Sequence, residues 1–304
     1  MVNRLRQPSS RARDIWFLCI WSATFIFCWR TLRQLVELSL TDDRYTYLVL
    51  IPIISSGIIF WKRDVFFREE RSGMRWGVPL FLLGFVLYWF SFSRWFLSSS
   101  SGIHLSAAVL GIAIVWIAIF ALCYGFPSVK AAIFPLLFLF LMIPIPASLL
   151  ERIVTGLQDG SATTTSILFR ILDVPVVRHG LRFSLPGVDI EIAEQCSGIR
   201  SSLSLFITGI LAGYLLLQSA GNRIFFSLFT IPLAIFKNGV RIVTLSWLGV
   251  YVDPGFLHGK LHQYGGLPVS LLALGILTPV IFALRRCEAS RGHRLTETLE
   301  SATI

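Results

Sequence analysis

A polar, glycine-containing stretch, Cys196-Ser-Gly-Ile-Arg200, stands where a long apolar segment begins, at about residues 197–217. We therefore expect the thiol of Cys196 at the N-terminus of a membrane helix. Free N–H groups and the positive end of the helix dipole lower the pKa of a thiol there and favour the nucleophilic thiolate. Capping by serine and glycine beside an incidental cysteine is the competing interpretation. Arg200 either assists the thiol or extends to lipid headgroups.

A second polar group, Asn238-Gly-Val-Arg241, follows Lys237 inside another apolar segment, at about 224–249. Asn238 and Arg241 are three residues apart and share one helix face. An arginine at that depth costs roughly 2.5 kcal/mol or more, so it should face a polar cavity or a partner. It is either a functional cation or a structural one that bonds to carbonyls or to Glu194. We assign Lys237 no role.

A third group contains His258 and His262, just before the last apolar segment. Two histidines four residues apart can bind a metal ion on a helix, but no acidic residue completes an HExxH pattern. We expect no metal and no cofactor. One imidazole is better suited to carry protons for Cys196, because a thiol nucleophile needs a base and later a proton donor. A thiolate, a cation and a base together suit acyl transfer.

The composition predicts an all-α integral membrane protein. Hydrophobic residues make up 55% of the 304 residues and charged residues 14%, with a mean hydropathy of +0.72. About twenty apolar residues cross the hydrocarbon core as a helix. Within a single domain, residues 1–304, we expect about eight transmembrane helices, at 15–35, 45–61, 76–93, 103–124, 129–149, 197–217, 224–249 and 264–284.

The basic residues predict the orientation in the membrane. With a cytoplasmic N-terminus, fifteen Lys and Arg residues lie in inner segments and five in short outer loops, as the positive-inside rule expects. The net charge of +10 is thereby explained without nucleic acid. Tails 1–14 and 285–304 are then cytoplasmic, and the N-terminus reads as a retained signal anchor. The three polar groups fall at the outer face.

One long extracytoplasmic connection, residues 150–195, separates the fifth and sixth spans. Residues 181–185 and 188–192 alternate around Pro186-Gly187, a pattern that predicts a small β-hairpin leading to Glu194. Residues 163–177 are expected to form an amphipathic helix at the membrane interface, shortened by Pro175.

The three groups together resemble the exosortases and archaeosortases, multi-spanning cysteine transpeptidases. The family has a Cys-Ser-Gly motif, an Asn-x-x-Arg motif and a later His before Gly, which correspond here to Cys196-Ser-Gly, Asn238-Gly-Val-Arg241 and His262-Gln-Tyr-Gly-Gly. The resemblance covers about residues 40–285 and includes Pro144-Ile-Pro146 and Asp43-Arg-Tyr45. A His often found shortly after that tyrosine is Tyr47 here.

The resemblance implies a cysteine protease of the inner membrane, with its active site facing outward, that cleaves C-terminal sorting signals through a thioester and transfers the product to a surface acceptor. Its substrates would be secreted proteins that end in a short motif, a hydrophobic helix and an Arg-rich tail. It assigns catalysis to Cys196, Arg241 and His262. As supporting or substrate-binding residues we name Asn238, Glu194, Ser197, Arg200 and His258.

Two other classes of function compete. A transporter or an exopolysaccharide-export subunit would use Arg241 in a substrate pathway, and Pro232 is the one candidate helix break for it. A lipid-linked glycosyltransferase would need outer carboxylates; Asp189, Glu191 and Glu194 are available but read as hairpin residues.

Overall fold

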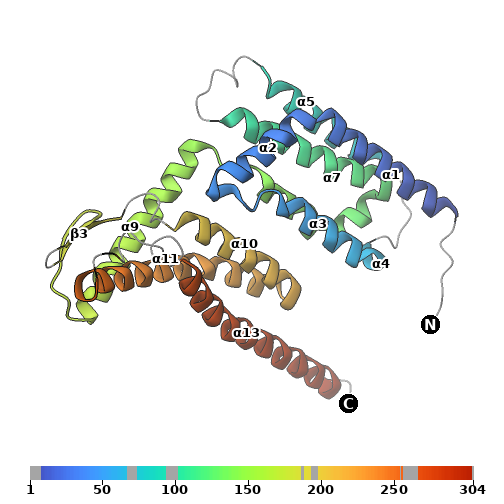
Figure 1. Ribbon diagram of the computed structural model, residues 1–304. Helices are drawn as coiled ribbons and strands as arrows, with labels where there is room; N and C mark the ends of the chain where they lie inside the picture. The colour runs from blue at the N-terminus through green and yellow to red at the C-terminus, as the bar shows by residue number, and fades with distance from the viewer. Residues whose placement is uncertain are drawn as a thin grey trace. The chain divides into compact units, whose positions relative to one another are not determined.

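A computed structural model of the chain describes residues 8–66, 74–93, 102–185, 188–192, 198–253, 255 and 266–302. The chain divides into two compact units, Met1–Leu150 and Glu151–Ile304, and each is described by itself. Both consist mainly of helices, drawn from blue to green for the first unit and from green to red for the second (Figure 1).

The described secondary-structure elements of the first unit are all helices. Its elements are α1 (Pro8–Phe27), α2 (Trp29–Thr41), η1 (Asp43–Tyr45), α3 (Leu50–Trp61), α4 (Arg63–Phe66), α5 (Met74–Phe90), α7 (Ile103–Ala131), α8 (Ile133–Phe138) and η2 (Leu139–Met142). The helix α9 (Ala147–Ile171) begins at the boundary between the units.

Helices α5 and α7 pack backbone against backbone in antiparallel fashion (Figure 1). A Cβ atom added to Gly111 would lie 2.7 Å from the backbone nitrogen of Tyr88, and one added to Gly84 would lie 2.9 Å from the carbonyl oxygen of Gly111. Small residues allow this approach, and in lipid such dispersion contacts replace the hydrophobic effect as the force between helices.

Polar contacts tie each end of the first unit together. At one end the hydroxyl of Tyr124 donates to Asp14, 3.0 Å away. At the other end Ser106 donates to the carbonyl of Pro144 across 2.7 Å. Residues near the expected inner ends of spans thus meet one another, and so do residues near the expected outer ends, as alternating spans require.

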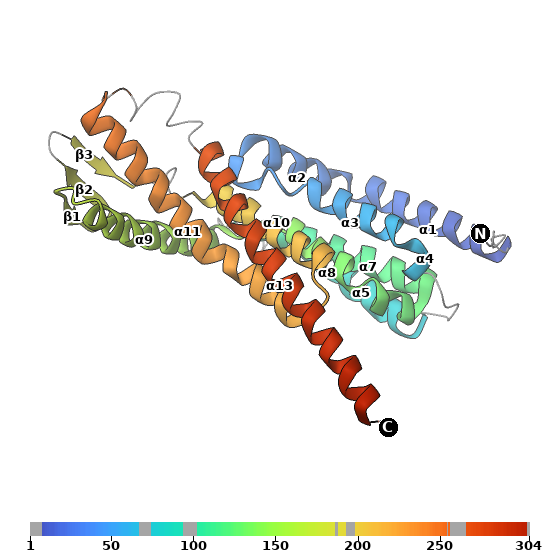
Figure 2. The same cartoon turned by 90° about the horizontal axis from the view of Figure 1, so that it is seen from below.

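The second unit combines three long helices with α9 and a small sheet. Its elements after α9 are β1 (Val177–His179), β2 (Arg182–Leu185), β3 (Val188–Glu191), α10 (Ile199–Leu216), α11 (Ala220–Tyr251) and α13 (Gly266–Ala302). α10 and α11 are antiparallel, since Gly198 lies against Asn238 and Gly213 against Arg223. α13 runs beside both (Figure 2).

The sheet is antiparallel in the order β1-β2-β3. The pairing expected of 181–185 and 188–192 is present as β2 and β3, from Arg182 opposite Glu191 to Leu185 opposite Val188. Strand β1 was not expected, and residues 186–187 of the turn lie outside the described part. Phe183 of β2 is buried against Phe169 of α9, with ring centroids 6.1 Å apart. The side of the membrane on which the sheet lies stays a prediction.

A carboxylate on α13 caps the start of α11. Glu288 accepts hydrogen bonds from the backbone N–H groups of Gln218 and Ser219, each 2.9 Å away, and from the side-chain amide of Asn222 at 2.8 Å. The first N–H groups of a helix have no intrahelical acceptor, and the positive end of the dipole attracts an anion. The turn between α10 and α11 is therefore bonded to α13.

The helical membrane architecture is confirmed. Among the residues described, five helices are long and apolar enough to cross a membrane, or up to seven if each of two bent helix pairs is one span. The expected count of eight stays a prediction. At Pro232, the possible helix break considered for a transporter, α11 continues without interruption.

Several span boundaries differ from expectation. The segment expected at 15–35 bends by 73° between α1 and α2, at Cys28. The segment expected at 129–149 ends at Met142, because Pro144 and Pro146 disfavour helical backbone in the residues before them. The amphipathic helix expected at 163–177 is the second half of α9, which already starts at Ala147 and ends at Ile171.

The close contact of α5 and α7 predicts the effect of one added methyl group. Gly111→Ala should destabilise the protein by about 1–3 kcal/mol, because the backbone of Tyr88 must move away. Thermal unfolding in detergent, followed by size-exclusion chromatography, measures this. Gly57→Ala on α3 is the matched control, since nothing lies within 4 Å of its Cβ position. Equal melting temperatures for the two variants would contradict the packing described.

Candidate functional site

The structure describes part of the site expected from the sequence. Gly198, Arg200, Asn238 and Arg241 are described. The other expected site residues lie outside the described part: Glu194, Cys196, Ser197, His258 and His262. The geometry therefore concerns the framework of the first two motifs.

Gly198 sets the start of α10 and follows Cys196 by two residues. It is the residue before the first helical turn, with φ of 71° and ψ of 16°. This left-handed conformation costs a residue with a Cβ roughly 1–2 kcal/mol, and glycine adopts it without that cost. The third residue of the Cys-Ser-Gly motif thus has a backbone reason to be glycine.

Gly198 also brings the first two motifs into contact. A Cβ atom on it would lie 2.9 Å from Oδ1 of Asn238 and 3.0 Å from its Cγ. Only a residue without a side chain lets the Asn238 amide approach the start of α10 so closely. The sequence places these motifs 40 residues apart, and the fold places them side by side.

The same amide is held from the other side by α9. The Nδ2 group of Asn238 donates a hydrogen bond to Oγ of Ser161 across 3.0 Å. Both side chains are buried, with exposures of 4% and 0%. Next to them, a Cβ on Gly239 would lie 2.7 Å from Cγ2 of Thr164, so α9 and α11 approach each other closely here. Asn238 therefore joins α9, α11 and the start of α10.

Two cations follow each other along α11. Arg241 lies one turn after Lys237, close enough for their charges to interact. Lys237 is only 3% exposed, near the middle of a 32-residue helix. Holding two like charges one turn apart is unfavourable without opposite charge or polar groups nearby. Arg200, by contrast, is exposed on α10.

The arrangement suits chemistry that develops negative charge. The start of α10 offers the positive end of a helix dipole and backbone N–H groups that have no acceptor within the helix. Arg241 adds a cation three residues from the amide that touches this start. A polar, largely buried setting of this kind stabilises an anionic nucleophile or an oxyanion more strongly than water does.

Sequence reasoning missed Ser161 and the part that α9 takes in the site. Residues 150–195 were read as a connection, because Asp159 and several Ser and Thr residues lower its hydropathy. A signal was nevertheless present. Gly160 and Thr164 form a small-residue pair four positions apart, a spacing that allows close helix packing.

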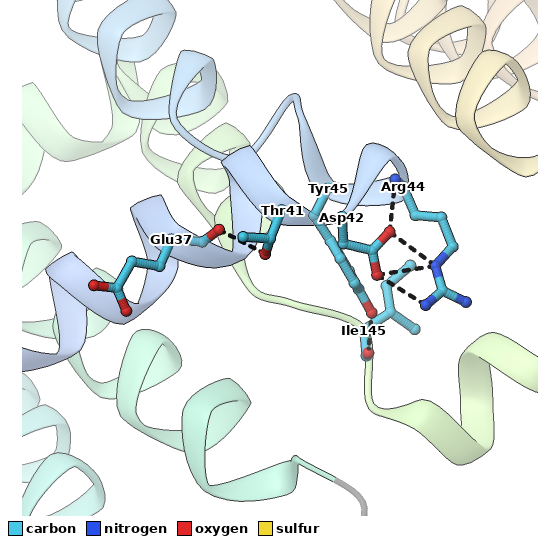
Figure 3. Close-up of polar contacts among 6 residues, drawn as sticks. All are labelled: Glu37, Thr41, Asp42, Arg44, Tyr45 and Ile145. Atoms are coloured by element: carbon cyan, nitrogen blue, oxygen red, sulfur yellow. Dashed lines mark hydrogen bonds and ion pairs between the residues drawn. The ribbon is translucent and has the colours of Figure 1, made fainter.

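Two further segments of the family resemblance meet in the first unit (Figure 3). The hydroxyl of Tyr45 donates to the carbonyl of Ile145, 2.9 Å away, and so joins Asp43-Arg-Tyr45 to Pro144-Ile-Pro146. Beside it, Arg44 donates to Asp42 through its backbone and its guanidinium at 2.8–3.0 Å. These hydrogen bonds lower the pKa of the Asp42 carboxyl below its ordinary value.

The contact between Gly198 and Asn238 is testable by substitution. Gly198→Ala should destabilise the protein by about 1–3 kcal/mol more than Gly102→Ala does, measured by thermal unfolding in detergent. Both glycines stand before a helix with positive φ, 71° and 66°, but nothing lies within 4 Å of a Cβ on Gly102. The control therefore removes the cost of the backbone conformation. Similar losses in both variants would refute the contact.

Comparison with known proteins identifies the family. The family model described as Transmembrane exosortase (Exosortase_EpsH) matches residues 29–278, which is 250 of the 304 residues. No curated protein and no solved structure matches the chain. The match includes the larger part of both helical units, the Gly198–Asn238 contact and Arg241. On this evidence, the chain belongs to the transmembrane exosortase family.

Proposed function

We propose that this exosortase-family membrane protein is a cysteine transpeptidase. It cleaves the C-terminal sorting signal of secreted proteins, a short motif followed by a hydrophobic helix and an Arg-rich tail. It then transfers the new C-terminus to a surface acceptor. It lies in the inner membrane with both termini in the cytoplasm, and the reaction takes place at the extracytoplasmic face.

The observation that carries the proposal is the contact of Gly198 with Asn238. A family match alone leaves open whether the motifs act together. The contact supports joint action, because it brings the glycine that follows Cys196 and the asparagine that precedes Arg241 to one place. The buried Lys237 and Asn238 and the half-buried Arg241 on one long helix support it as well, since polar residues at membrane depth are costly and usually functional.

In the proposed mechanism the Cys196 thiolate attacks the scissile carbonyl carbon. Arg241 stabilises the oxyanion of the tetrahedral intermediate, and Asn238 orients Arg241 or the carbonyl. The C–N bond then breaks, and His262 gives its proton to the leaving amine. A thioester remains. The acceptor nucleophile loses its proton to His262, attacks the thioester and releases the thiolate.

Removal of the nucleophile tests the proposal. Cys196→Ala should slow processing of a co-expressed secreted reporter with a tripartite C-terminal signal by about 10³-fold or more, because no thioester can form. Immunoblots of full-length and cleaved reporter measure this. Cys287→Ala is the control, an exposed cysteine outside the motifs, and should process normally. Normal processing by a membrane-inserted Cys196→Ala protein would refute the transpeptidase.

Thiol labelling distinguishes a transpeptidase from an export subunit, and the experiment needs no substrate. In a protein whose Cys19, Cys28, Cys123 and Cys287 are replaced by alanine, Cys196 should react with a membrane-impermeant maleimide added outside. Its rate at pH 7 should exceed that of a protein retaining Cys287 alone, labelled in open membranes, by about tenfold, as a lowered thiol pKa predicts. A Cys196 that is inert in folded protein would favour the non-enzymatic transporter or exopolysaccharide-export subunit.

A further inference from the structure

Ser161 differs from the hydroxyl residues that surround it on α9. Thr163 and Thr164 donate to carbonyls of their own helix, those of Asp159 and Gly160, each 2.9 Å away. Ser161 instead accepts a hydrogen bond from another helix, from the amide of Asn238. Its side chain is fully buried. Its contact therefore joins α9 to the second motif.

The Asn238 amide lies between Ser161 and Gly198, with its NH₂ group toward the serine and its oxygen toward the glycine. A primary amide has a donor end and an acceptor end, and rotation about its last side-chain bond exchanges them. Because Nδ2 bonds to Ser161, Oδ1 is left against Gly198, at the start of α10. Backbone N–H groups there lack intrahelical acceptors, so an oxygen suits the position and an NH₂ group does not.

We propose that Ser161 is a positioning residue that acts through Asn238: it holds the amide so that its oxygen faces the start of α10 that carries the Cys-Ser-Gly motif. The proposal rests on the proposed function, since the motif positioned is the one that contains the nucleophile. It gives α9, which lies in the segment expected to be a connection, a direct part in the geometry of the reaction.

The consequence for catalysis is specific. Without the Ser161 hydroxyl, the amide rotates more freely and Oδ1 faces Gly198 for only part of the time. Substrate binding does not involve Ser161, which is buried between helices. Loss of the hydroxyl should therefore reduce the fraction of bound enzyme in the reactive arrangement, and so kcat, while KM stays the same.

The experiment uses full-length protein in membranes and the tripartite-signal reporter. Ser161→Ala should lower kcat by about threefold to tenfold, the range expected for one net hydrogen bond, with unchanged KM. Rates are normalised to folded protein measured by size-exclusion chromatography. Ser246→Ala is the matched control: Ser246 is equally buried, but its hydroxyl donates to the carbonyl of Ile242 in its own helix at 2.7 Å. It should retain wild-type kcat.

A double-mutant cycle tests whether the effect passes through Asn238. In an Asn238→Ala background, Ser161→Ala should cause no further loss of kcat. A full additional loss, a change in KM alone, or wild-type kcat in Ser161→Ala would each overturn the proposal. If Ser161→Ala yields no folded protein, Asn238→Ala alone decides, since normal kcat in that variant would leave Ser161 nothing to position.

Cys196→Ala in the same assay separates failure of the Ser161 positioning role from failure of the proposed transpeptidase function. If it is inactive and Ser161→Ala is fully active, the positioning role fails and the transpeptidase stands. If Cys196→Ala processes the reporter normally, the proposed function itself fails.

Discussion

The central constraint on the second unit is the polar stretch of α11. Lys237, Asn238 and Arg241 stand near the middle of a long, mainly apolar helix, at a depth where lipid offers no hydrogen bonds. The surrounding helices meet this constraint by close approach. α10 begins with a glycine against the amide of Asn238, and α9 presents the hydroxyl of Ser161 to it. The close packing of α9, α10 and α11 thus provides polar contacts for the short polar segment of α11.

Close approach at small residues is common to both units. In the first unit Gly84 and Gly111 let the backbones of α5 and α7 touch, and in the second unit Gly239 lets α11 approach the Thr164 side chain of α9. Apolar side chains alone give little preference for protein neighbours over lipid tails, so shape and backbone proximity decide which helices pair. At Gly198 the close approach brings the start of α10 against the side-chain amide of Asn238, a polar group of the second motif.

Hydropathy and motif spacing predicted the helical membrane architecture, the β2–β3 pairing and the family. They did not predict where helices bend. Cys28 interrupts the first apolar segment with no proline or glycine as a signal. The start of α9 at Ala147 was hidden because amphipathic helices have low mean hydropathy. Ser161 was missed because its hydrogen-bond partner, Asn238, is 77 residues away in the sequence and no motif spacing links the two. A serine in a polar segment is also typical of a surface position.

The carboxylate of Glu288 fixes the height of α13. Sliding this helix by one turn, about 5.4 Å, would break all three hydrogen bonds to the turn between α10 and α11. The hydrogen bonds of Glu288 therefore fix the axial position of α13 relative to α10 and α11. A force on the chain beyond Glu288 would therefore act on the turn between α10 and α11 as well as along α13.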